Sequence, residues 1–186
     1  PRFLGRIHQE AQRLVSLIND ILGLSQLDEG AAMPRESVSL LSLAQEAAAS
    51  LSAAAQAQNV TLTVNGTAGT LTGVRRLLSE AVRNLCENAV KYNVPGGSVT
   101  VTVAETPQAV TLTVADTGIG IPPADQSRVF ERFYRVDKSH SRAIGGTGLG
   151  LSIVKHAVAC HHGTVQLDST PGQGTVITVT LPKDAA

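Results

Sequence analysis

Residues 80–93 carry the sequence EAVRNLCENAVKYN, around which the rest of the chain can be interpreted. Asn84 and Asn88 are four residues apart and share one face of a helix, and Lys91 lies one turn beyond. Amide oxygens are hard ligands suited to Mg²⁺, and lysine is a compact charge suited to phosphate. The row therefore fits one wall of a magnesium–nucleotide site, although asparagines that satisfy backbone groups or face water are the simpler interpretation of this helix alone. Apolar residues at helical spacing predict that it packs on a core: Ala81, Val82, Leu85, Ala89 and Val90.

Two later glycine-rich stretches favour the magnesium–nucleotide interpretation of this helix over the simpler one. Residues 116–122, DTGIGIP, follow an alternating strand pattern, and their glycines allow the turns and close approach that a bulky ligand requires. Residues 145–150, GGTGLG, precede the apolar-periodic run LSIVKHAV, so a glycine-rich loop leads into a helix N-terminus, which favours an anion such as phosphate. Either loop alone is typical of an ordinary turn. The asparagine-bearing helix and both loops, in this order, favour a nucleotide site.

These stretches resemble the catalytic ATP-binding region of sensor histidine kinases. NLCENAVKYN is similar to the N box of that family, DTGIGIP to its first glycine box, VFERFYRVD to its F box and GGTGLGLSIVKH to its second glycine box. The wider superfamily, with gyrase B, Hsp90 and MutL, shares the asparagine and glycine elements. The KY pair, the FERFYR stretch and the LSIVK ending resemble histidine kinases in particular.

The order of the expected elements indicates an α+β fold, a mixed sheet of about five strands with helices packed on one face. The resemblance implies the two-layer α/β sandwich of Bergerat, or GHKL, type. Ser42 and Thr72 are expected to cap the two long helices, and Asn65-Gly66 to form a turn after the second strand. Strands are expected near residues 37–41, 60–64, 98–105, 109–115, 164–168 and 175–181, and helices near residues 42–58, 72–93, 125–132 and 149–161.

Residues 2–28 predict a long N-terminal helix with a heptad seam at Ile7, Ala11, Leu14, Ile18 and Ile21. Such a helix needs a partner, so homodimerisation or docking in a bundle is expected. By resemblance, residues 1–30 are a partial dimerisation and histidine phosphotransfer helix, residues 31–35 a linker and residues 36–183 the ATP-binding catalytic domain. His8 does not lie in an acceptor-like motif, and the helix that bears the acceptor histidine in relatives is missing from this sequence. We therefore expect ATP binding without self-phosphorylation.

Composition excludes several classes of function. The 186 residues include 15 basic and 15 acidic side chains, so the balance is neutral and nucleic acid is not an expected partner. Apolar runs stay well below the ~18 residues of a membrane span. We expect a soluble, cytoplasmic chain, and the resemblance implies that the full-length protein is anchored in the cell membrane. Cys86 and Cys160 are expected as buried thiols, and His161-His162 beside a helix C-terminus in water.

The resemblance also implies roles at the adenine and magnesium end of the site. Asn88 is the best candidate for direct Mg²⁺ coordination, and Asn84 assists it. Tyr92 is expected along the adenine or ribose, and Asp116 is expected to accept the adenine amino proton. The backbone is expected to pass close to the base at Gly118, Gly120 and Ile121.

At the phosphate end, the resemblance implies that Lys91 contacts a phosphate and that Arg132 and Arg135 stabilise charge. Asn84 joins these three as the expected catalytic set, whereas Glu87 lies on another helix face and receives no role. Residues 134–146 are interpreted as a basic lid hinged at Gly145 and Gly146, the alternative being a solvated loop. The cradle for the phosphates is expected from Gly146, Thr147, Gly148, Leu149 and Gly150.

The reaction implied is transfer of the ATP γ-phosphoryl group, with Mg²⁺, to a histidine nitrogen, for relay to an aspartate in a response regulator receiver domain. A structural dimerisation element would explain residues 1–30 but would leave the glycine-rich loops unexplained. Two other classes also stay open from the residues themselves. One is another GHKL-type ATPase or protein serine kinase, and the other is a nucleotide-binding module without catalysis.

Overall fold

The computed structural model describes residues 34–136 and 147–183. The expected N-terminal helix with His8, most of the expected lid and its hinge, and Gly146 of the expected phosphate cradle lie outside the described residues. The proposed division at residues 31–35 therefore stays a prediction. Within the described residues, no helix has the length and apolarity needed to cross a membrane.

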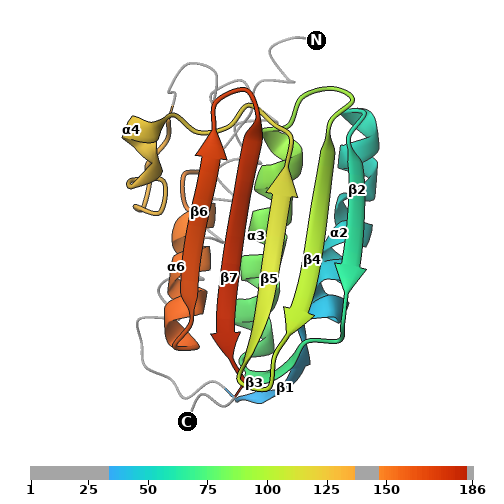
Figure 1. The fold of residues 1–186 in the computed structure, drawn as a ribbon, viewed down its shortest axis with the longest axis vertical. Helices are drawn as coiled ribbons and strands as arrows, with labels where there is room; N and C mark the ends of the chain where they lie inside the picture. Colours follow the sequence, from blue (N-terminus) through green and yellow to red (C-terminus); the bar gives the residue numbers. More distant parts are fainter. Residues whose placement is uncertain (1–33, 137–146, 184–186) are drawn as a thin grey trace, which may run out of the picture.

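A five-stranded mixed sheet forms one layer of the molecule (Figure 1). Strands β2 and β4 are parallel, and each remaining neighbouring pair is antiparallel, so the sheet is mixed as predicted. The expected hairpin and the C-terminal strand pair are both confirmed. In sheet order the strands are β2 (Thr61–Gly66), β4 (Ser98–Glu105), β5 (Ala109–Asp116), β7 (Gly174–Pro182) and β6 (Thr164–Thr170).

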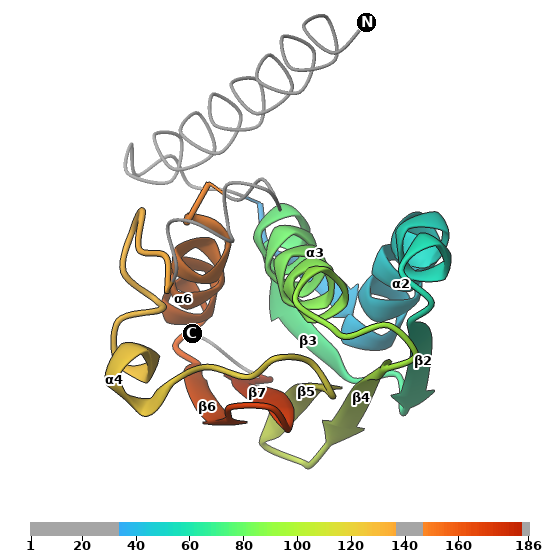
Figure 2. The ribbon, with the colours of Figure 1, turned by 90° about the horizontal axis from the view of Figure 1, so that it is seen from above.

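In the part of the chain that the structure describes, the long helices cover one face of this sheet, because its strands alternate valine or leucine with threonine. Val99, Val101 and Val103 of β4 are buried toward the helices, and the intervening threonines face the other way. Three helices lie side by side on that face (Figure 2): α2 (Leu40–Ala57), α3 (Arg75–Lys91) and α6 (Gly150–Cys160). The two-layer α+β architecture is therefore as predicted.

Only one strand of the second, two-stranded sheet was predicted. Strand β1 (Glu36–Ser39) was expected, but its antiparallel partner β3 (Thr70–Gly73) was not. The prediction that Thr72 caps α3 is wrong, because Thr72 is paired within β3. Helix α3 instead begins after Val74, whose own side chain makes no capping hydrogen bond.

His161 corrects another expectation, since it is completely buried rather than in water. The backbone N–H of Val74 donates to its Nε2 at 2.9 Å, and its Nδ1 lies 2.6 Å from the carbonyl oxygen of Ala157. A nitrogen that accepts from an amide carries no proton, so the Nδ1–H must donate to Ala157. This neutral imidazole joins the end of α6 to the start of α3.

Several element ends also differ from expectation. Ser39, not Ser42, caps α2, because the Ser39 hydroxyl accepts from the N–H of Ser42 at 3.3 Å. Asn65 and Gly66 belong to β2 rather than to a turn. The helix expected over residues 125–132 is only the short α4 (Pro123–Gln126), which is followed by irregular turns.

The two cysteines differ in exposure. Cys86 is buried as expected, and this burial raises the pKa of its thiol to about 12. Cys160 is only half-buried, so the expectation of a buried thiol is wrong there.

Candidate functional site

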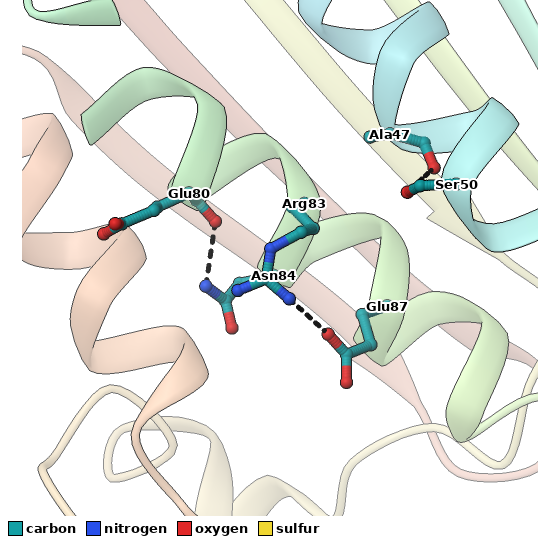
Figure 3. Close-up of polar contacts among 6 residues, drawn as sticks. All are labelled: Ala47, Ser50, Glu80, Arg83, Asn84 and Glu87. Carbon is teal, nitrogen blue, oxygen red and sulfur yellow. Dashed lines mark hydrogen bonds and ion pairs between the residues drawn. The ribbon is translucent and has the colours of Figure 1, made fainter. Parts of the chain in front are cut away.

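One wall of the site is the face of α3 that carries Asn84 and Asn88. The Asn84 amide nitrogen donates to the carbonyl oxygen of Glu80 at 2.8 Å (Figure 3), so one half of this side chain does satisfy a backbone group. Its oxygen is directed at the first residue of α6, because a Cβ built on Gly150 would lie 2.8 Å from Asn84 Oδ1 and 3.6 Å from Asn88 Nδ2. Glycine at this position is what lets the start of α6 approach both amides.

Glu87, which was expected on another helix face, is three residues from Asn84 and four from Lys91 and so borders the side of α3 that carries them. It pairs with Arg83 at 3.1 Å, one turn apart, and both side chains are about half exposed (Figure 3). An exposed pair of this kind adds little stability. Glu87 is nevertheless near enough to Lys91 for its negative charge to offset part of the lowering of the Lys91 pKa that burial causes.

Lys91, Tyr92 and Arg135 form a cationic group at the C-terminal end of α3. Burial lowers the pKa of Lys91 and the Arg135 charge lowers it further, while burial raises the pKa of the Tyr92 phenol. Lys91 Nζ lies 5.6 Å from the centre of the Tyr92 ring. Two nitrogens of Arg135, Nε and Nη2, are buried without a hydrogen-bond partner among the described residues. Buried cationic donors without an acceptor fit an anionic ligand.

Asp116, at the end of β5, begins the first glycine-rich loop. Its Oδ1 accepts from the backbone N–H of Gly118 at 2.8 Å. Burial raises the pKa of this carboxyl, and hydrogen bonds from the backbone of Gly118 and Thr175 partly counteract that rise. A half-buried carboxylate fixed in this way can accept a hydrogen bond from an amino group of a ligand.

The same loop packs closely between the end of α3 and the β6–β7 turn. A Cβ on Gly118 would lie 2.4 Å from the carbonyl oxygen of Tyr92, and one on Gly120 would lie 2.2 Å from that of Thr170. Gly120 also has φ of +69°, which favours glycine. The N–H of Ile119 donates to the Tyr92 carbonyl at 3.1 Å, so the loop backbone is bonded directly to the asparagine-bearing helix.

The second glycine-rich loop is fastened to the F-box stretch. The N–H of Phe133 donates to the carbonyl oxygen of Gly148 at 2.9 Å, and a Cβ on Gly148 would lie 2.9 Å from the Phe133 carbonyl carbon. Leu149 is fully buried and anchors the start of α6, and its N–H donates to the Thr147 hydroxyl at 3.3 Å. The first turn of α6, with N–H groups free of intrahelical partners, therefore begins against the asparagine wall.

The structure thus brings most of the predicted residues into one region, in three connected groups. Arg132 is the exception: its side chain is exposed and, within the described part of the chain, shares no hydrogen bond with the other predicted residues. A surface cavity of about 300 Å³ lies elsewhere, between α2 and β2, and no predicted site residue lines it. Sequence reasoning missed Gln126, Ser169 and Thr175, which carry no periodic or motif signal but are bonded to the first glycine-rich loop or to its aspartate.

Comparisons with known proteins agree with this geometry. Residues 73–185 match the family described as histidine kinase-, DNA gyrase B-, and HSP90-like ATPase. The chain is 39% identical over 184 residues to the sensor-like histidine kinase SenX3 of Mycolicibacterium smegmatis, which covers 98% of this chain and 48% of SenX3. It is 37% identical to the sensor histidine kinase WalK of Bacillus subtilis, covering 98% of this chain and 30% of WalK.

Solved structures give the same result. The mycobacterial sensor histidine kinase MprB superposes with a TM-score of 0.70 and 31% identity, covering 80% of this chain and 97% of that one. Full-length ShkA in complex with AMPPNP superposes with a TM-score of 0.82 and 27% identity, covering 100% of this chain and 39% of that one. The chain spans about half the length, or less, of the curated relatives it matches. It belongs to the histidine kinase-, DNA gyrase B-, and HSP90-like ATPase family, as a catalytic domain of the sensor histidine kinase type.

Proposed function

We propose that this chain binds ATP with Mg²⁺ between α3, α6 and the loop that follows Asp116, and supplies the γ-phosphoryl group for transfer to a histidine on a helix outside these 186 residues. The observation that carries the proposal is the meeting of Asn84 and Asn88 with Gly150 at the start of α6. Amide oxygens and a helix N-terminus are brought together there, and these two kinds of group suit Mg²⁺ and phosphate respectively.

The donor set fits the proposed magnesium ion. Asn88, assisted by Asn84, supplies hard amide oxygens, and Mg²⁺ is commonly held by few protein ligands together with substrate phosphates. When bound, the ion neutralises phosphate charge. Nε and Nη2 of Arg135, which have no hydrogen-bond partner among the described residues, and the desolvated ammonium of Lys91 supply further positive charge to a polyphosphate. An anion placed beside both cations would offset the burial and the Arg135 repulsion that lower the pKa of Lys91.

Base recognition is assigned to the opposite end of the site. The Asp116 carboxylate would accept a hydrogen bond from the adenine amino group, because an ionised carboxylate can only accept hydrogen bonds. Gly118 and Gly120 bring the loop backbone close beside it, and Ile121 follows in the same stretch. Tyr92 lies between the phosphate-binding cations and this loop.

Phosphoryl transfer needs positioning and charge neutralisation more than covalent chemistry from the protein, and this arrangement supplies both. The wider proposal follows from the family. The phosphohistidine would be relayed to an aspartate of a response regulator receiver domain, residues 1–30 would serve dimerisation, and the whole protein would be anchored in a membrane. Named relatives that are sensor histidine kinases support it.

The test is the stabilisation of the chain by ADP, measured by thermal unfolding with and without Mg²⁺. Ligand at 100 times its dissociation constant should stabilise the fold by about 2.7 kcal/mol. Asn88→Ala should remove the magnesium-dependent part of this shift, because it removes a ligand oxygen. Asn65→Ala, an exposed asparagine in β2, is the matched control and should keep the full shift.

Arg135→Ala tests the phosphate end separately. Because Arg135 would pair with phosphate, its removal should weaken ADP more than adenosine. An Asn88→Ala protein whose ADP shift keeps its full magnesium dependence would contradict the magnesium assignment. A wild-type chain with no shift in ADP or ATP would reject the proposed function.

A further inference from the structure

Two polar side chains hold the loop that follows Asp116, and neither has a role in the site as described so far. The Ser169 hydroxyl, at the end of β6, accepts from the backbone N–H of Ile121 at 2.8 Å. The same oxygen lies 3.0 Å from the carbonyl of Gly174 and 2.9 Å from the hydroxyl of Thr175. Ser169 therefore joins the far end of the loop to the start of β7.

Gln126 reinforces the same junction from α4. Its amide nitrogen donates to the carbonyl oxygen of Ile121 at 2.9 Å and to that of Ser169 at 2.8 Å. One amide group thereby uses both of its hydrogens to hold two backbone segments together. Ser169 and Gln126 bind both the N–H and the C=O of Ile121, so the end of the loop is fixed in position and in orientation.

The same set of contacts extends to the Asp116 carboxylate, which is proposed to recognise the base. Thr175, which contacts the Ser169 hydroxyl, is buried and pairs directly with Asp116 across β5 and β7. The Thr175 backbone lies beside the Asp116 carboxyl and partly counteracts the rise in its pKa that burial causes. Ser169 is thus linked to Asp116 through Thr175, the partner of Asp116 across β5 and β7, while the Asp116 carboxylate accepts from the N–H of Gly118 at 2.8 Å.

We propose that Ser169 and Gln126 are positioning residues for base recognition, which set the preference of this site for an adenine nucleotide over its 6-oxo counterpart. The inference rests on the proposed function. Adenine presents an amino donor at position 6, and hypoxanthine presents an oxygen acceptor there. A correctly placed carboxylate favours the first and repels the second, because it can only accept hydrogen bonds. Ser169 and Gln126 act through Asp116 and the loop, and neither touches the phosphate end.

The experiment compares dissociation constants for ADP and inosine diphosphate, measured by calorimetry with Mg²⁺ on the full chain. These ligands share ribose and phosphates and differ in the group at position 6. Ser169→Ala removes the acceptor of the Ile121 N–H, and Gln126→Met removes both amide donors at nearly constant side-chain length. In each variant the preference for ADP should fall about three- to tenfold, as expected when one hydrogen bond is misaligned.

Three controls separate positioning from simple loss of structure. Ser169→Thr keeps the hydroxyl and should restore the preference, and Gln166→Met, at an exposed position of β6, should leave it unchanged. Lys91→Ala should weaken both ligands by the same factor. Thermal unfolding without nucleotide shows that each variant is folded at the assay temperature, and Gln126, on the short α4, lies outside the core.

The outcomes are distinguishable. A wild-type chain that binds ADP, with an unchanged ratio in Ser169→Ala and Gln126→Met, overturns this inference and leaves the proposed function in place. A wild-type chain that binds neither ligand overturns both. A lowered ratio in the two variants, with Ser169→Thr and Gln166→Met unchanged, supports the positioning role.

Discussion

Replacing His161 with leucine should destabilise the fold strongly, although His161 touches none of the residues proposed to bind nucleotide. The imidazole is fully buried, accepts from the N–H of Val74 at 2.9 Å and donates to the carbonyl of Ala157 at 2.6 Å. Leucine fills a similar volume and offers neither bond. The change therefore leaves one donor and one acceptor without partners at the junction of α3 and α6.

The expected cost follows from those two groups. A buried polar group left unsatisfied costs about 1–3 kcal/mol. Val74 is only half-buried, so water replaces part of its lost acceptor and the sum lies near the lower end, about 2–3 kcal/mol. For a chain of this size, that corresponds to a fall in melting temperature of about 4–12 °C. His162→Asn is the control, because His162 is exposed and asparagine tolerates its positive φ of 54°.

The pKa of His161 predicts how the effect of His161→Leu on stability changes with pH. Burial lowers the pKa of His161 below its ordinary value, the bond to Ala157 partly counteracts this, and the nearby charges of Arg35 and His162 lower it further. The fold therefore favours the neutral ring, so the contribution is complete above the unfolded pKa of about 6.5 and is lost as pH falls through the folded pKa. The difference in stability between wild type and His161→Leu should shrink on acidification.

Thermal unfolding at about pH 7.5 and about pH 5.5, monitored by circular dichroism, measures both effects. Equal melting temperatures for His161→Leu and His162→Asn would refute the bonding argument. A gap that widens as pH falls would refute the assignment of a neutral ring.

The remaining predictions concern the nucleotide site. Gly118→Ala should weaken ADP in calorimetric titrations, since the new Cβ would lie 2.4 Å from the Tyr92 carbonyl and displace the loop; unchanged affinity would show that the loop yields without cost. Because burial raises the pKa of Asp116, protonation should begin to weaken ADP binding at a higher pH than it would for an ordinary aspartate, and Asp116→Asn should flatten that dependence. The 186-residue chain should bind γ-labelled ATP without gaining acid-labile label, because buried His161 has both ring nitrogens bonded and no histidine lies in an acceptor-like motif; stoichiometric label lost in His8→Ala would overturn this.

Much of the local structure could be predicted from the sequence because it depends on neighbours along the chain. The alternation of valine and threonine in residues 98–105 and 109–115 identified both strands of the hairpin and the face they bury. The four-residue spacing of Asn84 and Asn88 correctly placed both on one helix face, and Gly118 and Gly120 do mark close backbone approaches. Predictions failed where the structure of a segment depends on a partner far away in the sequence. Strand β3 forms because β1 pairs with it, and four residues are too few to show a periodic pattern of their own.

Tertiary structure alone decided which distant groups meet. The bond between His161 and Val74 spans 87 positions, and that between Ser169 and Ile121 spans 48, so neither leaves a local pattern that can be read from residue spacing. His161 was expected in water because a histidine beside a helix end is usually solvated, but the packing of α6 on α3 closed that end to solvent. Local patterns report the geometry of one element, whose repeat is fixed by the backbone, whereas a site built between elements depends on how their buried faces pack.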